Sequence, residues 1–173
     1  GDDPAEYNRL KNKIDGLSLK CVTGQKDSPW RDKINGVKYV CEENDMGITE
    51  FAFRFSDEKE GEFVFINGQG EKNIPFGVNH NVFGHFPQYG YSREVGREKT
   101  TDGFTYKDAV SLAWLQDNKI VLNVQIIDDY FGNMSAVFAF KDDCVSATFA
   151  SAAENFLTEY RGWLFAKRIN RRE

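Results

Sequence analysis

Short runs in which apolar and polar residues alternate, separated by turn sequences of a few residues, make up most of this chain. The clearest run covers residues 48–55, where Phe51, Phe53 and Phe55 fall on one face of an extended strand. Turns rich in charge or glycine follow it, and a further alternating run begins beyond each turn. Strands that lie so close in sequence can pair only as hairpins, so the pattern predicts an antiparallel sheet.

Nine or ten such runs can be counted after residue 36, with little helix-forming sequence between them. A flat sheet of that many strands would expose long unpaired edges, so closure into a barrel or stacking as a sandwich is expected. The sequence therefore predicts an all-β fold, with an antiparallel lipocalin-like β-barrel as the expected architecture and a β-sandwich as the alternative. The predicted strands are 37–42, 48–55, 62–67, 71–76, 108–115, 119–127, 134–140, 144–150 and 162–168.

The start of the chain follows a different period. Pro4 suits a first helical turn, and Tyr7, Leu10 and Ile14 recur at spacings of three and four residues. This spacing predicts a short N-terminal helix. An irregular linker is expected between this helix and the first strand, because glycine and proline interrupt it.

The chain thus divides into an N-terminal helix and linker (1–35) and an antiparallel β-barrel domain (36–173). Within the barrel domain, residues 77–107 are expected to form a long loop with one or two short strands. A second short helix is expected at 152–160, before the closing strand.

Composition limits the classes of function. The 173 residues are 40% hydrophobic and 28% charged, which is typical of one globular domain, and 15 phenylalanines favour a sheet. The net charge of −5 argues against general nucleic-acid binding, which needs a concentrated positive surface. No apolar run approaches the ~20 residues of a membrane-spanning helix.

Cysteine and histidine give no pattern typical of a metal or cofactor site. Cys21, Cys41 and Cys144 are odd in number and lack C-x-x-C spacing, so neither a zinc site nor a disulfide framework is predicted. Cys144 opens an alternating run and is interpreted as a small core residue. His80 and His85 are five residues apart, which places them on opposite faces of a strand.

One short motif invites a catalytic interpretation. Ser56 and Lys59 have the S-x-x-K spacing of penicillin-recognising serine enzymes, in which a buried helix holds the lysine amine against the serine hydroxyl. Here the motif lies in an acidic turn, where a solvated lysine keeps its proton and cannot act as a base. Asp128 and Asp129 are adjacent, so a strand would point their carboxylates apart. We therefore predict no catalytic residues.

Aromatic residues gather in the middle of the chain. Phe83, His85, Tyr89 and Tyr91 lie in the irregular stretch, and Trp114 lies on the strand beyond it. Aromatic side chains with polar tips at the mouth of a barrel can hold a small ligand, so these five form the candidate ligand site. Ordinary core and loop packing is the alternative interpretation.

Several stretches resemble a known type of domain. They are Phe51-x-Phe53-x-Phe55, residues 74–77 (Ile-Pro-Phe-Gly), residues 111–122 (SLAWLQDNKIVL) and residues 138–140 (Phe-Ala-Phe). In order and spacing they resemble the C-terminal accessory domain of serine hydrolases related to β-lactamases and penicillin-binding proteins. The resemblance runs from about Leu17 to Phe140.

In that family the nucleophile and its lysine lie in a separate hydrolase domain, which has no counterpart in this chain. The resemblance therefore implies a non-catalytic module that packs beside a fused or associated serine hydrolase domain and modulates it. It also favours a periplasmic or extracytoplasmic location. The glycine- and proline-rich ending of the family is replaced here by residues 160–165 (YRGWLF).

Two other hypotheses stay open. One is a stand-alone lipocalin-like binder of a small apolar or amphipathic ligand, using the candidate ligand site. The other is an enzyme that uses Ser56 and Lys59. An aromatic-lined interior cavity would favour the ligand binder, whereas a fused hydrolase would favour the accessory domain.

Overall fold

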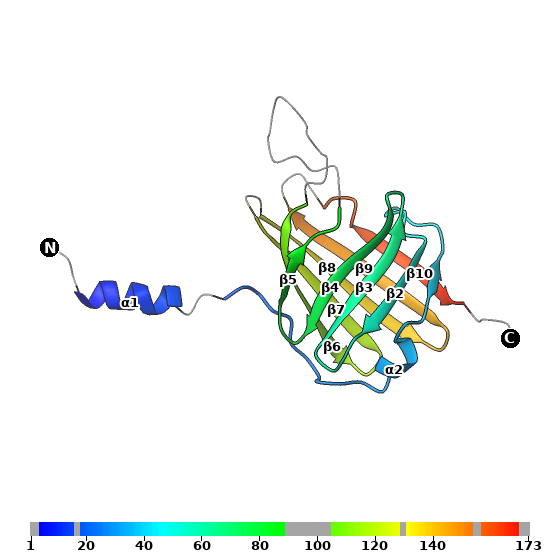
Figure 1. Ribbon diagram of the computed structural model, residues 1–173, viewed down its shortest axis with the longest axis horizontal. Coiled ribbons are helices and arrows are strands. Elements are labelled where there is room, and N and C mark those ends of the chain that lie inside the picture. The colour runs from blue at the N-terminus through cyan, green and yellow to red at the C-terminus, as the bar shows by residue number, and fades with distance from the viewer. Residues whose placement is uncertain (1–3, 16–17, 89–104, 129–130, 154–156, 170–173) are drawn as a thin grey trace, which may run out of the picture.

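The computed structural model describes residues 4–15, 18–88, 105–128, 131–153 and 157–169, and most of them belong to one β-barrel (Figure 1). The helices are α1 (Pro4–Asp15) and α2 (Arg31–Ile34). The strands are β1 (Tyr39–Cys41), β2 (Glu50–Phe55), β3 (Glu60–Asn67), β4 (Gly70–Val78), β5 (Val82–His85), β6 (Lys107–Gln116), β7 (Lys119–Ile127), β8 (Phe131–Lys141), β9 (Cys144–Ala153) and β10 (Gly162–Arg168).

Nine of these strands form a closed wall in the order β4-β3-β2-β1-β10-β9-β8-β7-β6, and β4 returns to β6 to complete it. Strand β5 is the extra strand and pairs with β6 alongside this closure. The expected barrel is therefore present, whereas the sandwich alternative is not. Apart from the β4–β6 pair, all the strand pairings are antiparallel, as predicted.

The closing pair is parallel, so the prediction of a purely antiparallel barrel is wrong at this seam. Gly77 and Val78 of β4 pair with Ser111 and Leu112 of β6. The reason is topological: the chain reverses direction twice between β4 and β6, once into β5 and once out of it, so that β4 and β6 run in the same direction. Gly77 also needs to be glycine, because a Cβ there would lie 2.5 Å from the backbone oxygen of His80.

Aromatic rings fill the inside of the barrel. Phe53 lies at the centre of this cluster, with ring centroids 4.9 Å from both Phe63 and Phe138. The predicted alternation is confirmed, since Phe51, Phe53 and Phe55 all join the buried core. Such ring pairs add about 0.5–1.5 kcal/mol each beyond the area they bury.

One end of the barrel, the α2 end, is closed by the segment before β1. The linker prediction is wrong here at one point, because residues 31–34 form the single helical turn α2 and bury Ile34 completely. Trp30 packs 6.0 Å from Phe140, and Asn35 accepts a hydrogen bond from the Phe55 N–H over 2.9 Å. These contacts hold the turn over the ring cluster.

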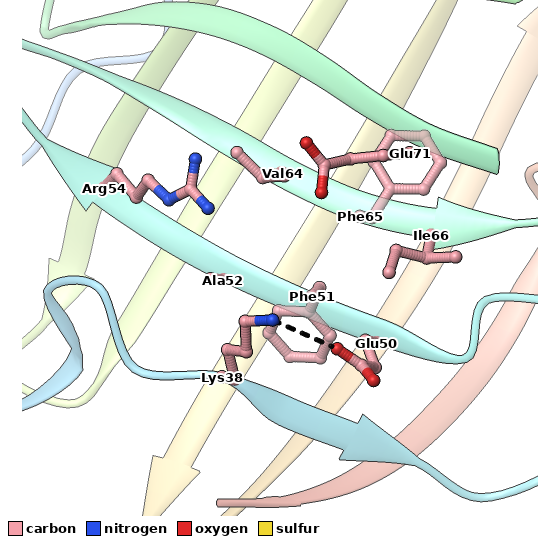
Figure 2. Close-up of a pocket in the computed structure, with 9 residues that line it drawn as sticks. All are labelled: Lys38, Glu50, Phe51, Ala52, Arg54, Val64, Phe65, Ile66 and Glu71. Carbon is pink, nitrogen blue, oxygen red and sulfur yellow. Dashed lines mark ion pairs between the residues drawn. The ribbon is translucent and has the colours of Figure 1, made fainter. Parts of the chain in front are cut away.

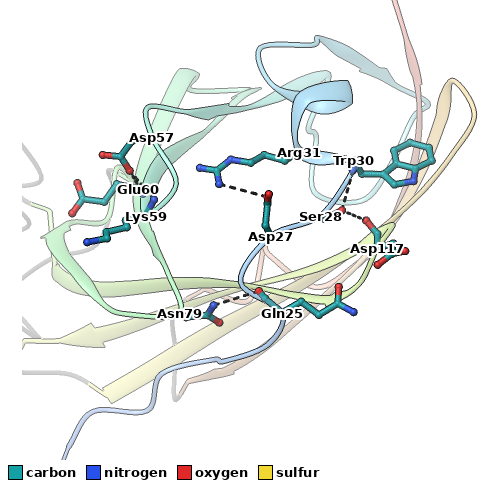
Figure 3. A network of polar contacts seen from close by, with 10 residues as sticks. All are labelled: Gln25, Asp27, Ser28, Trp30, Arg31, Asp57, Lys59, Glu60, Asn79 and Asp117. Carbon is teal, nitrogen blue, oxygen red and sulfur yellow. Dashed lines mark hydrogen bonds and ion pairs between the residues drawn. The ribbon is translucent and has the colours of Figure 1, made fainter.

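Residues 18–29, the lead-in segment, are attached along the outside of the barrel (Figure 3). The Ser28 hydroxyl donates to the Asp117 carbonyl, and the Gln25 N–H donates to the Trp114 carbonyl over 2.8 Å. Asn79 accepts from the Gly24 N–H over 2.7 Å and donates to the Gln25 carbonyl over 3.3 Å. The close approach needs Gly24 itself, because a Cβ there would lie 2.2 Å from the Trp114 oxygen.

The opposite end, the Tyr160 end, is closed by the turn before β10. The predicted helix at 152–160 is wrong, because β9 continues to Ala153 and residues 157–160 form a turn. Leu157, at φ 60°, and Tyr160 are both buried there. The Tyr160 hydroxyl donates to Gln88 Oε1 over 2.6 Å, and the ring contacts Phe86 edge-on at 5.5 Å. Pairing with the long β8 strand, together with this buried turn, overrides the helical tendency of the alanines.

The prediction for Cys144 is also wrong. This residue was interpreted as a core residue, but it pairs with Lys141 and Lys167, which places it on the outer side of the barrel where it is half-buried. Val145, Ala147 and Phe149 of β9 face the core instead. All three cysteines are free thiols.

We predict that Phe53→Ala lowers the free energy of unfolding by about 3–5 kcal/mol, because it leaves a cavity among rings that cannot collapse into it. Urea unfolding followed by circular dichroism measures the change. Phe83→Ala is the matched control: its side chain is 64% exposed, so we expect a change within about 0.5 kcal/mol. Equal losses for the two variants would contradict a core centred on Phe53.

Candidate functional site

The structure separates the residues of the predicted ligand site. Trp114 is completely buried inside the barrel and stacks on Phe55 at 6.2 Å. Phe83 and His85 lie on β5, where both are exposed on the outer side. Tyr89 and Tyr91 lie outside the described residues. The ring cluster occupies the part of the interior that Trp114 faces, so a ligand there would have to displace aromatic side chains.

The Ser56–Lys59 motif forms a turn between β2 and β3, as predicted. The Ser56 hydroxyl donates to the Glu60 carbonyl over 3.0 Å. The Asp57 carboxylate accepts from the Lys59 N–H over 2.7 Å and from the Glu60 N–H over 2.9 Å, and these bonds lower the pKa of Asp57. The hydroxyl is thus engaged by the backbone of its own turn.

The two histidines lie in different surroundings. His80 Nε2 is 3.5 Å from Glu60, and its Nδ1 is 3.1 Å from the Val78 carbonyl oxygen. His85 lies on β5, where its side chain is exposed. Within the described part of the chain, no group of three histidine, cysteine, aspartate or glutamate residues is placed to hold a metal ion. No described helix is long and apolar enough to span a membrane.

A shallow hollow lies on the outer side of β2 and β3 (Figure 2). Ala52, Val64 and Ile66 contribute apolar lining, and charged side chains surround them. Lys38 pairs with Glu50 at 3.8 Å. Arg54 on β2 pairs with Glu62 on β3 at 3.3 Å. Because these charges neutralise one another at an exposed surface, the hollow has no strong preference for a cation or an anion.

The Tyr160 end contains a buried acid. Asp108 is 1% exposed and lies on the inner face of β6, opposite Gly84 of β5 and Ile126 of β7. Its carboxylate accepts backbone N–H bonds from Gly84 and from its own residue, whereas Oδ2 has no hydrogen-bond partner. Desolvation raises the pKa of Asp108 to about 7 and outweighs the opposing effect of the two backbone bonds.

The feature that the sequence did not reveal is a group of uncharged residues on the outer side of three adjacent strands, bordered by Lys167, whose ammonium lies 5.7 Å from the centre of the Phe165 ring. We call it the uncharged face. It consists of Ser135, Val137 and Ala139 of β8, Ser146, Thr148 and Ala150 of β9, and Trp163 and Phe165 of β10. The strand register places these residues in neighbouring rows, because Val137 pairs with Thr148 and Thr148 with Trp163. Trp163 is 71% exposed.

Elsewhere on the outer side of the barrel, the type of outward residue differs between covered and uncovered strands. Where the lead-in segment covers β6, the outward residues Ser111 and Ala113 are small, uncharged and buried. On β2 and β3, where the outer side borders the hollow, Glu50, Arg54 and Glu62 are charged. The uncharged face thus has the composition of a covered surface, although much of it is exposed. Alternate positions of three predicted strands carry this signal in the sequence, but without the register they could not be assigned to one surface.

No protein-family model matches the chain, and no significant match is found among curated proteins or solved structures.

We predict that the stability of the wild-type protein falls between pH 4 and 7 relative to that of Asp108→Asn. The pKa of about 7 in the folded protein lies above the usual aspartate pKa of 3.8, so over this range the unfolded chain releases a proton that the folded protein retains. The loss should be on the order of 4 kcal/mol in total and should level off above pH 7.

Urea unfolding at pH 4.5, 6 and 7.5 measures this difference, and Asp117→Asn, which changes an exposed acid, is the control. The asparagine retains an acceptor for the Gly84 N–H, so the variant should fold. Parallel pH profiles for the wild type and Asp108→Asn would show that the buried carboxyl is ionised in the folded protein throughout this range.

Proposed function

We propose that this barrel is a non-catalytic binding module that packs against a neighbouring protein domain through the uncharged face. The observation that carries the proposal is Trp163, which is 71% exposed within a surface of small, uncharged residues. Aromatic residues are enriched, and charged residues depleted, at the centres of protein interfaces. Trp163 is therefore the expected anchor, and the small side chains of Val137 and Thr148 in the same row offer little obstruction to a second surface.

The size of the face sets what it contributes. Three strands about 4.8 Å apart and three residue rows about 7 Å apart cover roughly 200–300 Å². A stable interface needs about 800 Å² from each partner, so the uncharged face would form its desolvated centre. Lys141 and Lys167, which pair with Cys144 in the next row, would lie at the rim.

A serine hydrolase domain of the penicillin-recognising type is the partner that the sequence resemblance supports. The module would pack beside that domain, fused to it or associated with it, and modulate access of its substrate. The small-ligand alternative has weaker support, because rings fill the part of the barrel that Trp114 faces and because Phe83 and His85 lie on the outer side.

We predict that a photoreactive amino acid at position 163 forms a covalent adduct with a serine hydrolase domain when the protein is expressed in its native source. Mass spectrometry of the adduct identifies that domain, and a native polypeptide heavier than 19.8 kDa would show that the two are fused. The same amino acid at position 83, another exposed aromatic position, is the control and should give no such adduct.

Once the hydrolase domain is identified, Trp163→Ala should weaken its binding about 30-fold, which corresponds to about 2 kcal/mol for loss of an interface anchor. Phe83→Ala should leave the affinity unchanged within twofold. Adducts that form equally from both positions, or full affinity in Trp163→Ala, would sink the proposal.

A further inference from the structure

Helix α1 carries a stripe of apolar residues that faces solvent. Tyr7, Leu10 and Ile14 are 68%, 56% and 54% exposed, and their spacing places them on one side of the helix. Figure 1 shows α1 extended away from the barrel. An isolated helix of 12 residues is marginal in water, because most helical stability in proteins comes from packing an amphipathic side. The helix therefore needs a surface to pack on.

The chain leaves the barrel close to the uncharged face. The Lys20 carbonyl accepts hydrogen bonds from the side chains of Gln125 on β7 and Asn81. The Val22 N–H donates to the Ser111 hydroxyl on β6 over 3.1 Å. The lead-in segment is thus fixed on β6 and β7, directly beside β8.

The remaining chain is long enough to reach the face. Residues 15–19 separate Ile14 from Lys20, and five extended residues span about 16 Å. From β7 across to β10 is three strand spacings, or about 14 Å. The linker can therefore place α1 over any of the three strands of the uncharged face on its own barrel.

Length and charge also agree. A helix of 12 residues is about 18 Å long, and the rows from Asn133 to Ala139 on β8 extend about 20 Å. Since the chain enters beside Gln125, which pairs with Asn133, the start of α1 would point toward the opposite end of these rows. Glu6, in the first turn of α1, would then approach Lys141 and Lys167.

We infer that α1 packs against the uncharged face of its own barrel and covers Trp163 until a partner domain displaces it. In the free protein, the apolar stripe of α1 and the uncharged face thereby shield each other from water. The displacement step rests on the proposed function, whereas the packing of α1 does not. A second copy is a weaker occupant, because the tether holds α1 near its own face at an effective concentration in the millimolar range.

The test is disulfide formation in the full chain after its three cysteines are replaced by serine. Leu10→Cys combined with Thr148→Cys, on the centre row of the face, should form an intramolecular disulfide under mild oxidation. Two control pairs should react at least about tenfold more slowly, since tethering without packing samples many positions. One is Arg9→Cys with Thr148→Cys, on the polar side of α1, and the other is Leu10→Cys with Arg54→Cys, on the opposite wall.

Equal rates for all three pairs, or a disulfide that forms only between two molecules, would overturn the inference. Binding to the hydrolase domain that is identified through position 163 tests displacement separately from the proposed function. Leu10→Ser should raise the affinity for that domain severalfold, because α1 no longer competes. Unchanged affinity in Leu10→Ser would exclude displacement, while loss of binding in Trp163→Ala would still support the module's function.

Discussion

The packing of aromatic rings around Phe53 is the interaction on which the rest of the structure depends. Rings from β2, β3 and β8 meet there at centroid distances of 4.9–5.4 Å, so strands far apart in sequence are held across the barrel as well as along its wall. The wall itself closes through only two residue pairs between β4 and β6. A seam this short is weak alone, and the core on its inner side supports it.

A filled interior moves the question of function to the outside of the barrel. The outer side contains one part covered by the lead-in segment, one part rich in paired charges, and one part that is uncharged and exposed. Exposed Lys38 and half-buried Glu50 need no partner protein, because water and their own ion pair satisfy them. Trp163 differs, because its large apolar side chain is exposed to water and its burial against a second surface would be favourable.

The sequence predicted the elements that depend on local pattern. The alternating runs located every strand except β5, which lies in the stretch where one or two short strands were expected without positions, and the aromatic alternation of β2 correctly assigned its inner face. The parallel seam between β4 and β6 was not predictable, because it is set by how many times the chain reverses in a stretch without clear periodicity. Cys144 was misassigned for a related reason: in an alternating run of small residues, the side that faces inward is decided by register with β10. The candidate ligand site grouped Trp114 with Phe83 by sequence neighbourhood alone, and the barrel wall separates them.

The same reasoning explains why the uncharged face lies where it does. The lead-in segment runs along β6 and β7 because Gly24 allows its backbone to touch that of Trp114, and because Asn79 and Gln125 bind its carbonyl groups. It leaves the wall before reaching β8, yet the uncharged face on β8, β9 and β10 shares the uncharged character of the residues beneath the lead-in segment. A cover that continues in the same direction along the wall accounts for this continuity, and the next segment of chain in that direction is α1.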